Sequence, residues 1–269
     1  MNLNWVYQIP LWLLVIPVFL LMLLAPMEAG FRLGARQHRA HPDAKEAARG
    51  DVTIAAMLTL LGLMLAFTYS FSMSRADLRK RAFTAEVNAL STAFLRADLA
   101  AEPGRTVLRE HLLNYARSRL VTREMVSNWS EFEKVIERSM EAQSKLWPAT
   151  RTAVRHQGDM TDPEKALLIS AINDVLDAHT SRMAVIFDRI PAPVLALLLL
   201  IAASALSMAA YNATLSGHQY RLRLTAFAVI LAVLMCVIVD FDFILHGFIR
   251  INHESLAALI QEMEASLEP

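Results

Sequence analysis

The amino-acid sequence predicts an all-α membrane protein with four transmembrane helices and an extramembrane helical bundle inserted between the second and third spans. Three observations support this prediction. The 269 residues are 55% hydrophobic and only 19% charged, which is too apolar for an ordinary soluble domain. Four apolar runs are long enough to cross a hydrocarbon core of about 30 Å. Between the second and third runs, apolar residues recur at helical spacing, without the alternation of a strand.

These runs divide the chain into three predicted parts. Residues 1–74 hold the first two spans and a basic connecting loop, residues 75–189 form the helical domain, and residues 190–269 hold the last two spans and a short C-terminal helix. The first apolar run extends from Trp5 to Met27. Because no Lys or Arg precedes this run, we interpret it as an uncleaved span rather than a signal peptide.

The second apolar run passes directly into a charged amphipathic segment. No Pro or Gly lies between Gly62 and Pro103, so no residue in this stretch forces the helix to stop at the membrane surface. The sequence therefore predicts one long helix from Val52 to about Leu99, which leaves the bilayer and becomes the first helix of the extramembrane domain.

The third and fourth spans are predicted after the domain. The third follows two prolines, Pro191 and Pro193, which suit the first turn of a helix because no amide donor is required there. The fourth extends from Leu224 to about Leu245. Four spans place both termini on the same side of the membrane.

Two helix starts are predicted inside the domain. Ser130 with Glu133 and Thr161 with Glu164 both have the spacing of a capping box. The first helix is expected to be interrupted at Pro148. The second is expected to run straight into the third span.

Basic residues leave the orientation open. The short connections carry Arg32, Arg36, Arg39, Lys45, Arg49, Arg221 and Arg223, and the opposite side carries the equally long set Arg75, Arg79, Lys80, Arg81, Arg182, Arg189 and Arg250. The greater weight of short loops favours a domain outside the cell. The juxtamembrane cluster at residues 75–81 suits an anionic cytoplasmic leaflet instead.

One face of the second span carries small and hydroxyl residues at steps of three and four. Such a face allows close helix packing, or lines a pore if several copies surround an axis; the sequence leaves both interpretations open. The pore-lining candidates are Thr59, Gly62, Ala66, Phe67, Tyr69, Ser70 and Met73, and the basic candidates at the pore mouth are Arg75, Arg79, Lys80 and Arg81.

Two carboxylates, Asp240 and Asp242, lie near the end of the fourth apolar run. A carboxylate there is costly unless it is solvated or paired. Residues two apart on a helix point to different faces, so these two do not form a ready carboxylate pair. Ion coordination, a proton site or a lock to a basic partner are possible roles, but we favour an interfacial position or a structural salt bridge.

Several functional classes find no support in the sequence. The formal net charge is zero, so no electrostatic argument favours nucleic acid as a partner. Walker, dinucleotide-binding and nucleophile-elbow motifs are absent, and the scattered histidines complete no metal site. We therefore expect no enzyme activity, cofactor or bound metal, and the lipid bilayer is the expected surrounding.

Three stretches resemble one family. The first stretch has an Ala-Phe pair at the end of an apolar span, followed by an Arg/Asp/Arg cluster, Glu-x-Asn-Ala and Leu-Arg-x-Asp-Leu. The second stretch is the Arg-to-Pro entry into the third span. The third stretch is an Asp-x-Asp…Gly-x-Ile ending, which lacks the usual proline after the aspartates. Together they resemble the bacterial bestrophin-like membrane proteins, which are distantly similar to bestrophin anion channels. The motif residues with expected structural roles are Asp77, Glu86, Asn88, Arg96, Asp240, Asp242 and Gly247.

Bestrophins are pentameric anion channels whose second span lines the pore and whose helical domain is cytosolic. The resemblance therefore implies a homo-oligomer in the bacterial inner membrane that passes chloride or other small anions, with the helical domain in the cytoplasm. The alternative hypothesis is a non-conducting membrane scaffold or sensor whose helical domain binds a protein partner.

Overall fold

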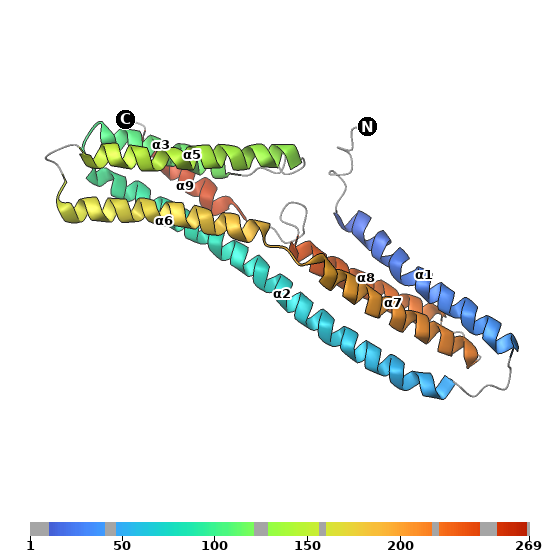
Figure 1. Ribbon diagram of the computed structural model, residues 1–269. Helices are drawn as coiled ribbons and strands as arrows, with labels where there is room; N and C mark the ends of the chain where they lie inside the picture. The colour runs from blue at the N-terminus through green and yellow to red at the C-terminus, as the bar shows by residue number, and fades with distance from the viewer. Residues whose placement is uncertain are drawn as a thin grey trace. The chain divides into compact units, whose positions relative to one another are not determined.

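The computed structural model describes residues 11–40, 47–120, 129–155, 160–216, 221–242 and 252–267, and all the regular elements in these ranges are helical (Figure 1). This confirms the all-α prediction. In chain order they are α1 (Leu11–Ala40), α2 (Ala47–Arg96), the short 3-10 turn η2 (Ala97–Leu99), α3 (Gly104–Arg119), α5 (Trp129–Arg155), α6 (Asp162–Phe187), α7 (Ala192–Leu215), α8 (Arg221–Asp242) and α9 (Glu254–Ala265).

Four stretches of the described chain are long and apolar enough to cross a membrane, as predicted. The apolar segments lie within the helical ranges Val15–Ala40, Val52–Leu99, Asp162–Leu215 and Arg221–Asp242, of which the second and third also include residues of the extramembrane domain. Helix α2 is continuous over 50 residues, so the predicted rod is unbroken at Ser74. Within its apolar half, the hydroxyls of Thr59, Thr68 and Ser72 each donate to the carbonyl four residues earlier at 2.8 Å, which satisfies these polar groups without water.

The chain folds into two compact units, divided between Ala76 and Asp77 on α2 and again between Asp188 and Arg189. The membrane unit contains α1, the first part of α2, α7 and α8. The helical unit contains the rest of α2, η2, α3, α5, α6 and α9. The sequence had grouped α9 with the last two spans, but Leu256 and Met263 of α9 are buried in the core of the helical unit.

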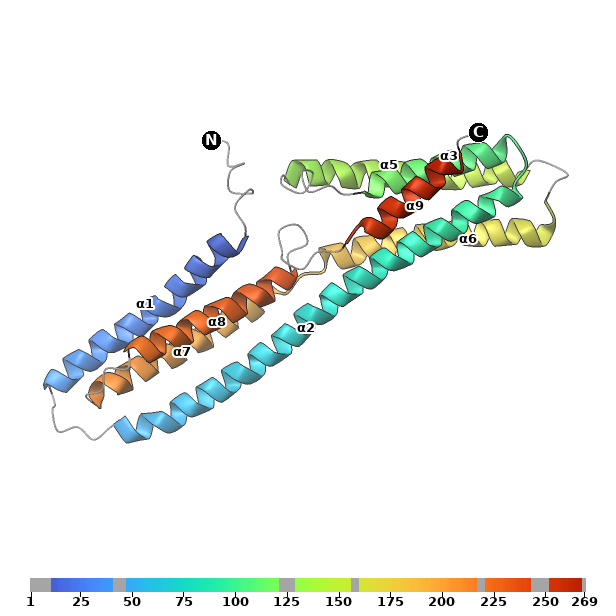
Figure 2. The same ribbon diagram turned by 180° about the vertical axis from the view of Figure 1, so that it is seen from behind.

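In the membrane unit, α1, α7 and α8 lie side by side (Figures 1 and 2). Glycines set the closeness of α1 and α7: a Cβ atom at Gly30 would lie 2.1 Å from the carbonyl oxygen of Ser207, and one at Gly34 would lie 2.7 Å from that of Tyr211. Small residues allow the two backbones to approach closely, and the resulting van der Waals packing holds the helices together in lipid, where the hydrophobic effect does not. The remaining core is made of Leu23, Met27, Leu61, Leu65, Leu198, Leu206 and Met235, among others.

The helical unit has a conventional apolar core, contributed by all its long helices. Leu90, Leu108, Leu112, Leu146, Leu168 and Ile172 are each at most 1% exposed. Helix α9 is also held to α3 by an ion pair, in which Arg117 Nη2 lies 2.7 Å from Glu264 Oε1. Helix α9 therefore packs with the other helices of the unit around α3.

Three local expectations can be compared with the structure. The capping box at Thr161 is confirmed, since the Thr161 amide donates to Glu164 Oε2 at 2.7 Å. The helix start predicted at Ser130 agrees to within one residue, since α5 begins at Trp129, and the Ser130 side chain lies outside the described part of the structure. The predicted interruption at Pro148 is wrong. Helix α5 continues to Arg155, because a proline removes only one hydrogen bond and packing on both sides compensates for it.

The third span is not a direct continuation of α6. Helix α6 ends at Phe187 and α7 begins at Ala192. Prolines explain the break, since Pro191 donates no amide hydrogen and disfavours helical geometry at the residue before it. The amide of Ile190, left without a helical acceptor, donates to Asp242 Oδ1 at 2.9 Å.

Candidate functional site

Helix α2 has one face that is buried along most of its length. In the membrane unit this face contains Leu61, Leu65, Thr68 and Ser72, and in the helical unit it contains Arg79, Phe83, Glu86 and Leu90. The steps of three, four and seven residues between them keep all these side chains on one side of the helix. The rest of α2 is therefore available to lipid, solvent or other molecules.

The small and hydroxyl residues predicted to line a pore lie on the opposite side. Thr59, Gly62, Ala66, Ser70 and Met73 are all exposed in the single chain. A Cβ atom built on Gly62 would meet nothing within 4 Å in the part of the chain that the structure describes.

Two aromatic candidates flank this face. Tyr69 is 37% exposed, and its ring lies edge-on to Phe241 of α8, with centroids 5.7 Å apart. Phe67 is exposed on the other flank, where Leu60, Leu63 and Phe71 are also exposed. These large apolar residues are the surface expected against lipid or a neighbouring apolar helix, so α2 presents two different surfaces side by side.

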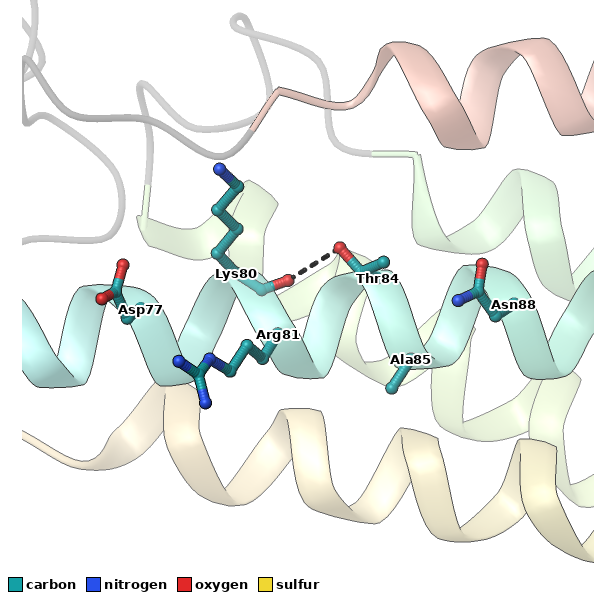
Figure 3. Close-up of a pocket in the computed structure, with 6 residues that line it drawn as sticks. All are labelled: Asp77, Lys80, Arg81, Thr84, Ala85 and Asn88. Carbon is teal, nitrogen blue, oxygen red and sulfur yellow. Dashed lines mark hydrogen bonds between the residues drawn. The ribbon is translucent and has the colours of Figure 1, made fainter.

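In the helical unit, the exposed face of α2 is polar and contains a shallow depression (Figure 3). The residues along it are Asp77, Lys80, Arg81, Thr84, Ala85 and Asn88. The Thr84 hydroxyl donates to the Lys80 carbonyl at 3.1 Å, and the Lys80 and Arg81 side chains extend to different sides of α2 in Figure 3. The family-motif residues Asp77 and Asn88 therefore lie on this exposed face.

The four basic candidates for a pore mouth are not equivalent. Lys80 and Arg81 are exposed beside the depression, but Arg79 is only 6% exposed. Arg75 is half-buried. Arg79 therefore points away from the surface that carries Lys80 and Arg81, because a helix turns each successive side chain by about 100°.

The helical unit contains a buried ionic cluster around Glu86. Arg119 of α3 binds this carboxylate in a bidentate manner, with Nε 2.7 Å from Oε1 and Nη2 3.3 Å from Oε2. Arg182 of α6 and the hydroxyl of Tyr115 donate to the same carboxylate. The remaining Arg119 nitrogen donates to Ser139 Oγ of α5 at 3.2 Å. One carboxylate therefore ties α2, α3 and α6 together, and Arg119 extends the link to α5.

The charges of the cluster follow from its contacts. Burial alone would raise the pKa of Glu86, but Arg119, Arg182 and the Tyr115 hydrogen bond outweigh it and lower the pKa. Glu86 is thus ionised, and Tyr115 donates its only hydroxyl proton to it. The His179 Nδ1 atom, 3.0 Å from the Tyr115 oxygen, must then donate its own proton, which assigns the tautomer of the neutral imidazole.

Two histidines face the cluster in neutral form. Burial, reinforced by Arg119 and Arg182, lowers the pKa of His179 to about 4, although Glu86 opposes this shift. Burial and the same two arginines lower the pKa of His253 to about 4. The His253 ring packs on Phe83 with centroids 5.0 Å apart, and Arg182 lies 4.8 Å from the centre of the same Phe83 ring. The cluster thus holds two buried guanidinium charges against one carboxylate.

The other family-motif residues lie outside the Glu86 cluster. Asp242 accepts the Ile190 amide at the break before α7, and Asp240 is buried in the membrane unit. Arg96 donates to the Leu167 carbonyl of α6 at 3.1 Å. Gly247 lies outside the described residues. No group of His, Cys, Asp and Glu within the described ranges could hold a metal ion.

Sequence reasoning identified Glu86 but not its partners. Tyr115 and Arg119 belong to α3, and His179 and Arg182 belong to α6, far from Glu86 along the chain. A signal for the cluster does exist, because Glu86 and Arg119 both lie on helix faces that are otherwise apolar. A charged residue on such a face predicts an opposite charge across the core.

Comparison with known proteins agrees with this architecture. The sequence profile of the bestrophin-like domain matches residues 21–256. This chain belongs to the bestrophin-like family. A crystal structure of a mutant bacterial bestrophin homologue from Klebsiella pneumoniae is similar, with a TM-score of 0.60 and 9% identity over 91% of this chain and 97% of that one. A crystal structure of a variant membrane protein has a TM-score of 0.55 and 11% identity, covering 96% of this chain and 98% of that one.

No curated protein matches the sequence. Membership of the bestrophin-like family and the four apolar stretches make the chain a membrane protein. Because the sequence identities to these two structures are low, the similarity shows a shared fold and nothing about activity. Family and fold together suggest a membrane ion channel rather than an enzyme.

Proposed function

We propose that this bestrophin-like protein is an oligomeric anion channel of the bacterial inner membrane, in which α2 of each copy faces a central axis. The observation that carries the proposal is the exposed face of α2, with Thr59, Gly62, Ala66, Ser70 and Met73 uncovered in the single chain. A face of small and hydroxyl residues beside a lipid-type face is what a pore helix requires, because each surface meets a different environment.

The charge on the continuation of α2 supports anions as the permeant ions. Lys80 and Arg81 are exposed beside the depression on α2, where Asp77 is the one carboxylate among the lining residues. Repeated around an axis, these side chains form a ring with net positive charge, which concentrates anions and repels cations. The family resemblance favours a pentamer with the helical unit in the cytoplasm.

Reconstitution into liposomes tests conduction. With a KCl gradient, the reversal potential is expected near the chloride equilibrium potential. Neutralising two charges in the K80Q/R81Q variant is expected to lower the chloride-to-potassium permeability ratio by roughly twofold or more, because the local anion concentration falls. The matched control K134Q/K145Q removes two exposed charges from α5 and is expected to leave the ratio unchanged. Pure protein without conductance would refute the proposal.

Disulfide trapping tests the arrangement of copies. In a Cys236→Ser background, Asn88→Cys places a thiol on the exposed face of α2, and Glu133→Cys places one on an exposed position of α5. Cross-linking between copies is expected for the α2 position and not for the α5 position. A protein that stays monomeric in both cases contradicts the axial arrangement and favours the scaffold hypothesis.

A further inference from the structure

A second charged surface lies on the membrane unit, away from the residues of α2 discussed above. It is formed by exposed arginines on the last turns of α1 and the first turn of α8. They are Arg32, Arg36 and Arg39 on α1 and Arg221 and Arg223 on α8. The two helices lie side by side in both views (Figures 1 and 2), and we call this surface the basic end.

Packing of α1 directs its arginines outward. Gly30 and Gly34 lie directly against the backbone of α7, so the face of α1 that contains them is covered. Arg32, Arg36 and Arg39 follow one another at steps of four and three residues and share a different face. All three side chains are exposed.

The charge of the basic end is unbalanced within the described residues. From Glu28 to the end of α1 and through the first turn of α8, five arginines are accompanied by one carboxylate, Glu28. Glu28 is already shared, since its oxygens lie 3.0 Å from Arg32 Nε and 3.1 Å from Arg221 Nη1. Arg221 also lies 4.5 Å from the centre of the Phe31 ring. The surface therefore has a net positive charge.

The depth of this surface matches the headgroup layer of a bilayer. Because the apolar run of α1 ends at Met27, we place the edge of the hydrocarbon at the pair of Glu28 and Arg221. At a rise of 1.5 Å per residue, Arg32 and Arg36 lie about 6 and 12 Å beyond Glu28. The headgroup region extends roughly 5 to 8 Å beyond the hydrocarbon on each side, within reach of both long side chains.

Exposed apolar side chains accompany the arginines. Leu33 is 55% exposed next to Arg32, and Leu222 is 84% exposed between the two arginines of α8. Leucines of this kind anchor a surface at the acyl boundary, while neighbouring guanidinium groups reach the phosphates. This combination distinguishes a lipid contact from a purely soluble charged surface.

We propose that the basic end is a binding site for anionic phospholipid headgroups, with Arg32 and Arg36 as its central residues. A guanidinium group donates two parallel hydrogen bonds to phosphate oxygens, and its charge stays fixed at any physiological pH. The site would hold annular lipid of the phosphatidylglycerol type in the leaflet at this end. It stands independently of whether the protein conducts ions.

Lipid-dependent thermal stability of the full chain in neutral detergent tests the site. Phosphatidylglycerol is expected to raise the unfolding temperature of the wild type more than phosphatidylcholine does. In R32Q/R36Q its half-saturating concentration is expected to increase about 25-fold, at about fivefold for each arginine lost near a membrane surface. The variant R36Q/R39Q leaves the Glu28 pairs intact and is expected to raise this concentration by about fivefold or more, through the loss of Arg36, even if R32Q/R36Q folds poorly.

The matched control R138Q/R151Q removes two exposed arginines from α5 and is expected to bind phosphatidylglycerol like the wild type. Free glycerol phosphate is expected to have no effect at the same concentration, since the apolar contacts are missing. Equal stabilisation by the two lipids in the wild type would overturn the proposal. So would equal weakening in R36Q/R39Q and R138Q/R151Q, or full stabilisation by glycerol phosphate.

Discussion

Both halves of α2 bury one face and expose another, but the surroundings of these faces differ between the two units. In the helical unit, its inner face meets the apolar core and the ionic cluster around Glu86, and α3, α5, α6 and α9 complete that core within one chain. In the membrane unit, Leu61 and Leu65 are buried, but a wide arc that includes Gly62 and Phe67 is exposed. The helical unit therefore stabilises itself, whereas the membrane half of α2 leaves a surface for lipid or further copies.

Removing the charge of Glu86 is expected to cause the largest loss of stability, because this carboxylate holds the helices of the helical unit together. In Glu86→Gln, Arg119 and Arg182 keep their buried charges without a carboxylate between them. Breaking a buried ion pair in this way costs about 3 to 5 kcal/mol. Denaturant unfolding of the full chain in detergent, followed by circular dichroism, measures the loss.

The control for this variant is Glu141→Gln on α5. Glu141 is 67% exposed and pairs with Lys145 four residues later at 2.6 Å. Exposed pairs of this kind contribute about 0.3 to 0.5 kcal/mol. If the two variants lost similar stability, the Glu86 cluster would not be the element that holds the helices of this unit together.

Acid is expected to weaken the helical unit, with a somewhat smaller effect. The folded pKa values of His179 and His253 are about 4, below the ordinary value of 6.5. Between these values the unfolded chain binds more protons than the folded one, so stability is full above pH 6.5 and falls as the pH drops towards 4. The loss is at most about 3 kcal/mol for His179 and less for the partly buried His253.

Unfolding midpoints measured from pH 7.5 to pH 4.5 test this expectation. The charged groups facing the histidines are Arg119 and Arg182, which disfavour protonation, and Glu86, which favours it but is already bound. The Tyr115 hydroxyl also contacts His179. His179→Gln is expected to reduce the pH dependence, and His38→Gln, at an exposed position of α1, is expected to leave it unchanged. A stability that does not vary over this pH range would contradict the neutral, buried state of the histidines.

Two glycine substitutions in the membrane unit are expected to have smaller and opposite effects on stability. In Gly30→Ala, the new Cβ atom meets the Ser207 carbonyl oxygen at 2.1 Å, and the required shift of α1 costs about 1 to 3 kcal/mol. In Gly62→Ala, the new atom meets nothing within 4 Å in the described chain, and the better helix propensity of alanine stabilises α2 by up to about 1 kcal/mol.

Thermal unfolding of the two variants, together with their conductance in liposomes, sharpens the comparison. A stable Gly62→Ala protein with altered conductance would indicate that this face of α2 lines the ion path. A strongly destabilised Gly62→Ala protein would instead mean that the face is already packed within its own chain.

Much of the fold could be predicted because it depends on local signals. The length and hydropathy of the apolar runs predicted four spans, and the lack of Pro and Gly after Gly62 predicted the continuous α2. The same local reasoning was wrong at Pro148, where the packing of α5 outweighs a single lost hydrogen bond. It also missed the break before α7, although Pro191 is a local signal for it. Only the bond from the Ile190 amide to Asp242, far along the chain, could not be predicted locally.

The sequence by itself determined that the chain is helical, where it crosses the membrane and to which family it belongs, because hydropathy, helix signals and motif residues are all written in neighbouring positions. Only the tertiary structure decided which face of α2 is buried, that Arg79 is buried, and that Glu86 binds Arg119 and Arg182. Partners that are distant in sequence become neighbours only when helices pack, and the low polarity of the packed interior then requires each buried charge to have a counter-charge.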